Sequence, residues 1–131
     1  LSLWSRLQAG EALDGFRPED VLGEARRGLS LLYSTDTRPV ADMVRLGKEC
    51  DLMVLEGMFG DPEKDERARV THHMTMREAA EIARDAQPSR LWLTHFSPAT
   101  PHPEEYLEEM QTLFPRLQMG ECGLKETLNF A

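Results

Sequence analysis

The sequence is short of cysteine, of long apolar runs and of positive charge, and each shortage excludes a class of protein. Cys50 and Cys122 are too few for a disulfide framework and lack metal-ligand spacing, so a reducing, cytoplasmic location is expected. No apolar stretch approaches the ~20 residues that a membrane span requires, and none resembles a secretory signal, so no membrane partner is expected. The formal charge of −8 argues against broad electrostatic binding of nucleic acid but leaves room for a local basic site.

The remaining composition is that of one soluble globular domain. The 131 residues are 40% hydrophobic and 29% charged, which excludes a disordered chain. Glycine and proline punctuate residues 1–28, which we interpret as an irregular lead-in to an α/β layer over residues 29–131. The chain begins with Leu1 instead of methionine, so we expect it to be a piece of a longer protein.

Apolar runs and helical periodicities alternate along residues 29–131. The runs predict buried strands at 29–34, 52–55 and 91–93, and closing strands at 117–119 and 124–130. Helices are predicted from Pro39 to about 47–50, from a capping box of Thr75 and Glu78 to before Pro88, and between Pro103 and Pro115. The charged stretch 61–67 is typical of a solvated loop or a frayed helix. This order predicts helices on a largely parallel sheet, in which function collects past the carboxyl ends of the strands.

Two carboxylates follow the first two predicted strands. Asp36 lies where the chain leaves the first strand and turns into a helix, so it can cap that helix or bind a metal. Glu56 comes after four apolar residues. It can be the first solvated side chain beyond the strand, or it can orient a nearby histidine and exchange a proton with it.

The four histidines lie in or beside predicted loops. His72 and His73 precede the second helix, where a plain surface position competes with a role in proton transfer. His95 ends the very apolar third strand; because a polar group there needs a partner, it is a candidate zinc ligand. We interpret His102, which lies between two prolines, as a turn residue.

Parallel pairing of the strands would bring four of these side chains to one edge of the sheet. Asp36, Glu56 and His95 follow successive strands, and His73 precedes a helix. Two histidines and two carboxylates form the kind of set that metal-assisted hydrolysis uses. The sequence therefore predicts a metal-dependent hydrolytic site at this edge.

Four segments carry a resemblance to a known family. Residues 33–39 read Tyr-Ser-Thr-Asp-Thr-Arg-Pro, residues 55–59 read Leu-Glu-Gly-Met-Phe, residues 73–75 read His-Met-Thr, and residues 93–97 read Leu-Thr-His-Phe-Ser. In the same order they resemble the Ser-Gly-Asp-Thr-Arg, His-Glu-Ala-Thr-Phe, His-Ser-Thr and final histidine motifs of ribonuclease Z, the tRNA 3′-processing endonucleases of the metallo-β-lactamase superfamily. Residues 3–11 are also similar to the family's approach to this half, so the resemblance covers essentially the whole chain.

The resemblance implies a role for each member of the convergent set. Asp36 would be the carboxylate that bridges two zinc ions, and His95 would be a ligand of one of them. His73 would assist proton transfer to the leaving 3′ oxygen, with Glu56 hydrogen-bonded behind it. The reaction would be hydrolysis of a phosphodiester, at the 3′ trailer of a tRNA precursor, by a metal-activated hydroxide.

The sequence also departs from the family pattern. Thr35 replaces the usual glycine, Leu55 replaces the histidine before the glutamate, and Pro98 and Ala99 stand where the family often has an arginine and a tyrosine. The main metal motif, His-x-His-x-Asp-His, a further histidine ligand and the arm that grips tRNA are not in the sequence. A two-zinc site needs about four ligands per metal, which is more than these residues offer. The resemblance therefore implies that the chain is the C-terminal half of an αββα sandwich, with a mixed sheet and helices on one face.

Three functions follow as expectations. The leading one is part of a zinc-dependent endoribonuclease that is inactive until a missing N-terminal half or a second chain completes it. The alternatives are a non-catalytic binding or dimerisation module derived from the fold, and a metallo-hydrolase of a small phosphodiester. Because an isolated layer exposes one apolar face of its sheet, we also expect a homo-oligomer that rebuilds the sandwich.

Overall fold

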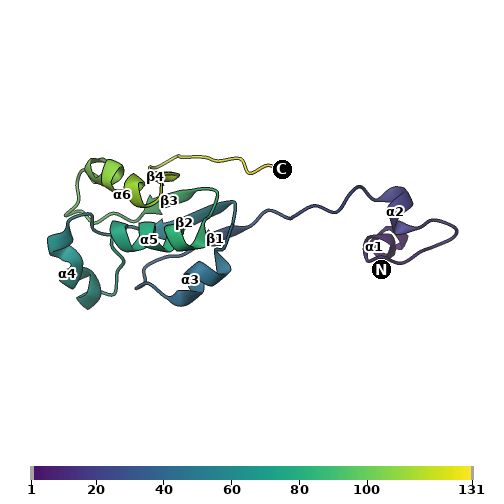
Figure 1. The fold of residues 1–131 in the computed structure, drawn as a ribbon, viewed down its shortest axis with the longest axis horizontal. Helices are drawn as coiled ribbons and strands as arrows, with labels where there is room; N and C mark the ends of the chain where they lie inside the picture. Colours follow the sequence, from purple (N-terminus) through teal and green to yellow (C-terminus); the bar gives the residue numbers. More distant parts are fainter. Residues whose placement is uncertain (1, 131) are drawn as a thin grey trace.

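The computed structural model describes residues 2–130. A body of strands and covering helices follows an N-terminal lead-in, which projects away from that body on an extended segment (Figure 1). Among residues 2–130, no helix is both long enough and apolar enough to cross a bilayer.

Four parallel strands form the sheet in the order of the sequence. They are β1 (Leu31–Tyr33), β2 (Leu52–Glu56), β3 (Leu91–Thr94) and β4 (Leu117–Met119). Right-handed crossovers that always step in one direction place the connecting helices on the same face. The predicted α/β class with helices on one face is confirmed. The sheet is parallel throughout these four strands, which corrects the expectation of a mixed sheet, because a helical crossover separates each strand from the next.

The predicted helices form in the connecting segments. They are α3 (Ala41–Leu46), α5 (Met76–Ala86) and α6 (Leu107–Leu113), the last preceded by the 3₁₀ turn η2 (Pro103–Tyr106). The predicted capping box begins α5, since the Thr75 hydroxyl accepts from the Glu78 amide and the Glu78 carboxylate accepts from the Thr75 amide. The charged stretch is helical, as η1 (Pro62–Lys64) and α4 (Asp65–Val70), because the Asp61 side chain caps its first turn.

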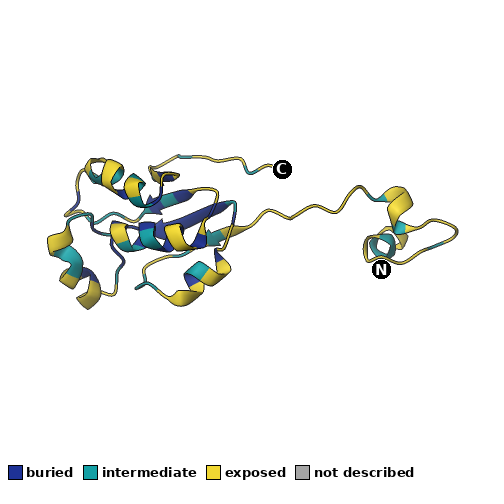
Figure 2. Ribbon diagram, in the orientation of Figure 1, coloured by how far each residue is buried: buried dark blue, intermediate teal, exposed yellow. Residues whose placement is uncertain are grey.

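One face of the sheet packs against the helices. Met53 and Leu55 of β2 and Leu91 and Leu93 of β3 are wholly buried there, as Figure 2 shows for the central strands. α5 presents alanines to these side chains, and their small volume lets the helix lie close to the sheet. This face holds the main core.

No helix covers the opposite face among the described residues (Figure 1), and we call it the open face. Leu31 and Tyr33 of β1 are 59% and 65% exposed on it, and Trp92 of β3 is half-buried. A hollow of about 530 Å³ lies between Tyr33, Trp92 and the segment around Cys122. Its lining is mainly apolar and aromatic.

The N-terminal lead-in is more regular than the sequence prediction. It contains two short helices, α1 (Leu3–Gln8) and α2 (Pro18–Val21). The Ser2 hydroxyl caps α1, and at the start of α2 the Asp20 carboxylate accepts from the Arg17 amide and guanidinium. These local hydrogen bonds explain helices that a short apolar pattern does not predict.

The predicted closing strand at 124–130 is wrong. These residues pair with no strand, because the turn at Gly123, whose φ is +88°, carries the chain away from β4. Side chains hold the segment instead. Glu126 forms an ion pair with Arg90, and the Arg26 guanidinium lies 3.8 Å from the centre of the Phe130 ring.

Candidate metal centre

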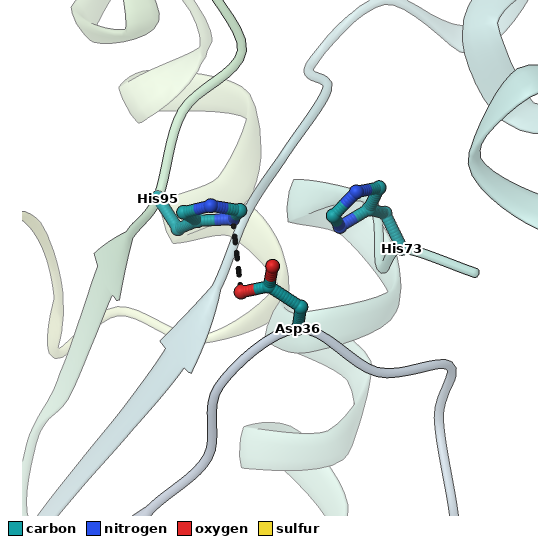
Figure 3. Close-up of side chains that lie close together, drawn as sticks. All are labelled: Asp36, His73 and His95. Atoms are coloured by element: carbon teal, nitrogen blue, oxygen red, sulfur yellow. Dashed lines mark ion pairs between the residues drawn. The ribbon is translucent and has the colours of Figure 1, made fainter. Parts of the chain in front are cut away.

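The carboxyl edge of the sheet brings the predicted site residues together. Asp36 lies in the loop after β1, Glu56 ends β2, and His95 follows β3 with a left-handed backbone of φ +57°. His73 lies just before the capping box of α5. Four segments that are distant in sequence therefore supply one side-chain cluster at this edge of the parallel sheet. Figure 3 draws three of its members, Asp36, His73 and His95.

Asp36, His73 and His95 form a group that could hold a metal ion. One potential ligand atom of each lies within 4.8 Å of the others. Asp36 Oδ1 is 3.4 Å from His95 Nδ1, and the two imidazole rings are 5.5 Å apart between centroids. Figure 3 shows the three side chains turned toward a common space. Nitrogen and oxygen donors of this kind suit zinc, so the chain's residues fit part of a zinc ligand set.

Glu56 is buried behind this group. Its side chain is 1% exposed, which overturns the interpretation of a first solvated residue beyond the strand. The carboxylate accepts hydrogen bonds from the amides of Thr37, at 2.8 Å, and Met74, at 3.0 Å. A buried carboxylate needs such partners, and here they tie the loops around Asp36 and His73 to the end of β2.

The same carboxylate orients His73. His73 Nδ1 lies 2.8 Å from Glu56 Oε2, whereas His95 Nδ1 lies 3.4 Å from the same oxygen. Because a carboxylate only accepts, Nδ1 of a neutral His73 ring carries the proton and Nε2 keeps its lone pair. His73 is therefore held as a base or ligand with one defined nitrogen free.

The structure also settles the helix-capping alternative for Asp36 and the positions of His72 and His102. Asp36 does not cap α3, whose first turn follows Val40 and has no side-chain cap, so the capping alternative for Asp36 is wrong. His72 is exposed on the loop before the site and has a left-handed backbone. His102 is exposed and immediately precedes the 3₁₀ turn η2, with its Nδ1 3.2 Å from Glu104 Oε1.

Sequence reasoning missed a polar pair that borders the site. The Arg38 guanidinium forms a bidentate ion pair with Glu78 and also donates to the main-chain carbonyl of His73. Arg38 lies in the first motif and Glu78 in the capping box, so both segments were identified. Forty positions separate the two residues, and only the fold brings them together.

The open-face hollow adjoins the metal group. His95 and Phe96 line it together with Tyr33 and Trp92. Within residues 2–130, Trp92 Nε1 is buried and has no hydrogen-bond partner. An unpaired buried donor is unfavourable, so this face is chemically incomplete in the described chain.

Comparisons with known proteins identify the family of the chain. Residues 7–96 match the family described as "Beta-lactamase superfamily domain". The chain is 42% identical to ribonuclease Z of Lachnoclostridium phytofermentans over 99% of its own length but 44% of the relative. It is also 42% identical to ribonuclease Z of Clostridium acetobutylicum, over 99% and 43% of the two chains. The chain thus spans less than half the length of these curated relatives.

Solved structures share the fold. The metallo-beta-lactamase fold protein YhfI from Bacillus subtilis superposes with a TM-score of 0.64 at 23% identity, over 73% of this chain and 39% of that one. A diphosphatase from the PhnP family superposes with a TM-score of 0.57 at 24% identity, over 79% and 37%. The resemblance to ribonuclease Z stated from the motifs is confirmed by the curated relatives. With a family match over most of its length and a shared fold, the chain belongs to the beta-lactamase superfamily.

Proposed function

We propose that this chain supplies one side of the active site of a zinc-dependent phosphodiesterase of the ribonuclease Z type, acting on the 3′ trailer of precursor tRNA in a reducing, cytoplasmic setting. The observation that carries the proposal is the Asp36, His73 and His95 group above the buried carboxylate of Glu56. The 42% identity to ribonuclease Z supports the choice of substrate class.

Each residue has a part in the proposed reaction. Asp36 and His95 would hold zinc from this side of the site, and Asp36 Oδ1 lies 3.4 Å from His95 Nδ1. Bound zinc would activate water and stabilise negative charge on the phosphodiester oxygens. In the proposed step a His73 ring that has taken up a second proton, on Nε2, would give that proton to the leaving 3′ oxygen, and the hydrogen bond from its Nδ1 to Glu56 keeps the ring in place for that transfer.

The remaining ligands must come from elsewhere. A two-zinc site needs about four ligands per metal, more than Asp36 and His95 offer. The chain matches 44% of the first relative's length, which is consistent with a second half or a second chain that supplies the others. We therefore propose that activity requires an assembly, and that in its absence the open face drives association of two copies of this chain.

Reconstitution tests this proposal. The chain is mixed with a polypeptide that carries the His-x-His-x-Asp-His half of a ribonuclease Z relative, association is verified by size-exclusion chromatography, and cleavage of precursor tRNA is compared with that of a small aryl phosphodiester. We expect zinc-dependent release of the trailer from the mixture and none from either part alone. A verified complex that takes up no zinc and cleaves neither substrate would contradict the proposal.

Substitution of Asp36, the carboxylate proposed to hold zinc, sharpens the result. Asp36→Ala removes a ligand that would contact both metals, so we expect zinc binding to be lost in the assembled protein. Asp42→Ala is a matched control, because Asp42 is exposed on α3 and pairs with Arg45 instead of the site. Stoichiometric zinc retained by the Asp36→Ala assembly would rule out the role assigned to Asp36.

A further inference from the structure

Arg38 connects the metal-side loop to the loop that carries His73. It lies two residues after Asp36, and its Nη1 donates to Glu78 Oε2 at 2.9 Å while Nη2 donates to Oε1. Nη1 also donates to the main-chain carbonyl of His73. One side chain thus joins the segments after β1 and before α5 at a point outside the ligand group itself.

The ion pair is partly shielded from water. The side chains of Arg38 and Glu78 are 28% and 25% exposed. Burial acts to raise the pKa of the Glu78 carboxyl, but hydrogen bonds from the Arg38 guanidinium and the Thr75 amide outweigh it and hold the pKa below its ordinary value. Bidentate pairing of this kind fixes direction as well as distance, which a single contact does not.

Arg38 and Glu56 hold the His73 loop from two sides. Glu56 accepts from the ring of His73 and from the Met74 amide, whereas Arg38 donates to the His73 carbonyl. Glu56 also accepts from the Thr37 amide, next to Arg38 in the chain. The ring and the backbone of His73 are therefore fixed by separate contacts, and both contacts lead back to the loop of Asp36.

The backbone before His73 explains why a second contact is needed. His72 has a φ of +60°, a left-handed conformation that is unfavourable for a histidine. The segment between α4 and α5 is short and must turn the chain sharply to bring His73 above Glu56. Without the Arg38 contact, the main-chain carbonyl of His73 would lose a hydrogen-bond partner and the loop could relax.

We propose that Arg38 is a positioning residue: paired with Glu78, it fixes the backbone of His73 so that the imidazole stays on Glu56 and faces Asp36 and His95. The proposal rests on the proposed function for its catalytic consequence, but the contact itself can be tested without metal or substrate. It assigns Arg38 no contact with the reacting atoms.

The test uses nitrogen-15 NMR of the full chain, observing the ring Nδ1–H of His73 and its exchange with water. In the unsubstituted chain we expect a protonated Nδ1 that exchanges slowly, because Glu56 holds it. Arg38→Ala should raise that exchange rate at least about tenfold, because the loop opens more often. Arg38→Lys keeps the charge but not the bidentate geometry, so it should restore part of the protection.

Arg77→Ala is the matched control. Arg77 also pairs with a glutamate on another element, Glu109 of α6, but the pair is exposed, and Glu109 is the partner that the structure gives to its guanidinium. Its loss removes an ion pair of the same type, and we expect His73 exchange to change by less than about twofold. Glu78→Gln keeps an acceptor for the Thr75 amide while weakening the pair, so it should raise exchange less than Arg38→Ala does.

Results that would overturn the role of Arg38 can be distinguished from results that would contradict the proposed hydrolysis. Unchanged His73 exchange in a folded Arg38→Ala chain would overturn the proposal, and so would an equal rise in Arg77→Ala. If Arg38→Ala does not fold, Arg38→Lys and Glu78→Gln carry the test, and unchanged exchange in both would overturn it. A reconstituted assembly that fails to cleave RNA contradicts the proposed hydrolysis but leaves this result standing, since the NMR measurement requires neither zinc nor RNA.

Discussion

The two faces of the sheet differ in how they are covered. On the covered face, alternate strand residues such as Leu55 and Leu91 are wholly buried beneath α5 and α6. On the open face, Tyr33 is 65% exposed and Trp92 Nε1 has no hydrogen-bond partner within the described chain. The strands that supply both faces are the same, so the difference lies in what covers them.

The difference between the covered face and the open face explains why this chain holds only part of a metal ligand set. The covered face gives the strands a fixed register, and their carboxyl ends then place Asp36, Glu56 and His95 at one edge. The open face is apolar and aromatic and adjoins His95. In a sandwich fold, a second layer covers such a face, and residues at its edge can complete the ligand set. We therefore expect stability to depend mainly on the covered face, and metal binding to depend on what covers the open face.

The largest expected effect is on the covered face. Leu91→Ala removes a wholly buried side chain from the core, so we expect the free energy of unfolding to fall by about 2–5 kcal/mol, measured by urea denaturation. Trp92→Phe is the control from the neighbouring position on the other face. Because it removes a donor without a partner, we expect a change within about 1 kcal/mol. Equal losses in the two variants would break the comparison.

The second-largest expected effect is a difference in thiol reactivity between the two faces of the sheet. Cys50 is 1% exposed in the core and burial raises the pKa of its thiol, whereas Cys122 is exposed beside the open-face hollow. We expect alkylation of Cys50 to be at least about a hundredfold slower, since it requires local opening. Mass spectrometry of the chain and of Cys122→Ser gives both rates. Similar rates at the two thiols would show that the core is not closed.

The smallest expected effect is a change in self-association of the chain through the open face. Tyr33→Ser removes an exposed aromatic side chain from that face, so we expect self-association to weaken by about tenfold, as measured by sedimentation equilibrium. Val70→Ser is the control, because Val70 is equally exposed but lies on α4, outside the open face. A strictly monomeric unsubstituted chain at high concentration would contradict the proposed homo-oligomer.

Local patterns in the sequence predicted most of the fold. The spacing of Thr75 and Glu78 and the alanines that follow identified α5, because capping and amphipathicity act within one helix. The alternation of strands and helices then predicted that Asp36, His73 and His95 would converge, which the parallel sheet permits. The roles assigned to these residues stay predictions.

Non-local contacts account for what the sequence did not reveal. The alternation of Leu124, Glu126, Leu128 and Phe130 is that of a strand, yet the turn at Gly123 and the ion pair of Glu126 with Arg90 hold these residues off the sheet. The burial of Glu56 and the pair of Arg38 with Glu78 likewise depend on segments that meet only in the folded chain. No local periodicity records such partners.

Zinc titration tests the central claim most directly. By isothermal titration calorimetry, zinc is added to the chain alone and to its complex with the half of a ribonuclease Z relative that carries His-x-His-x-Asp-His. If Asp36 and His95 form one side of a shared site, the complex binds two zinc ions tightly and the chain alone binds at most weakly, with no binding by the Asp36→Ala complex. Equal zinc binding by the chain alone and by the complex, or full binding by the Asp36→Ala complex, would contradict the account.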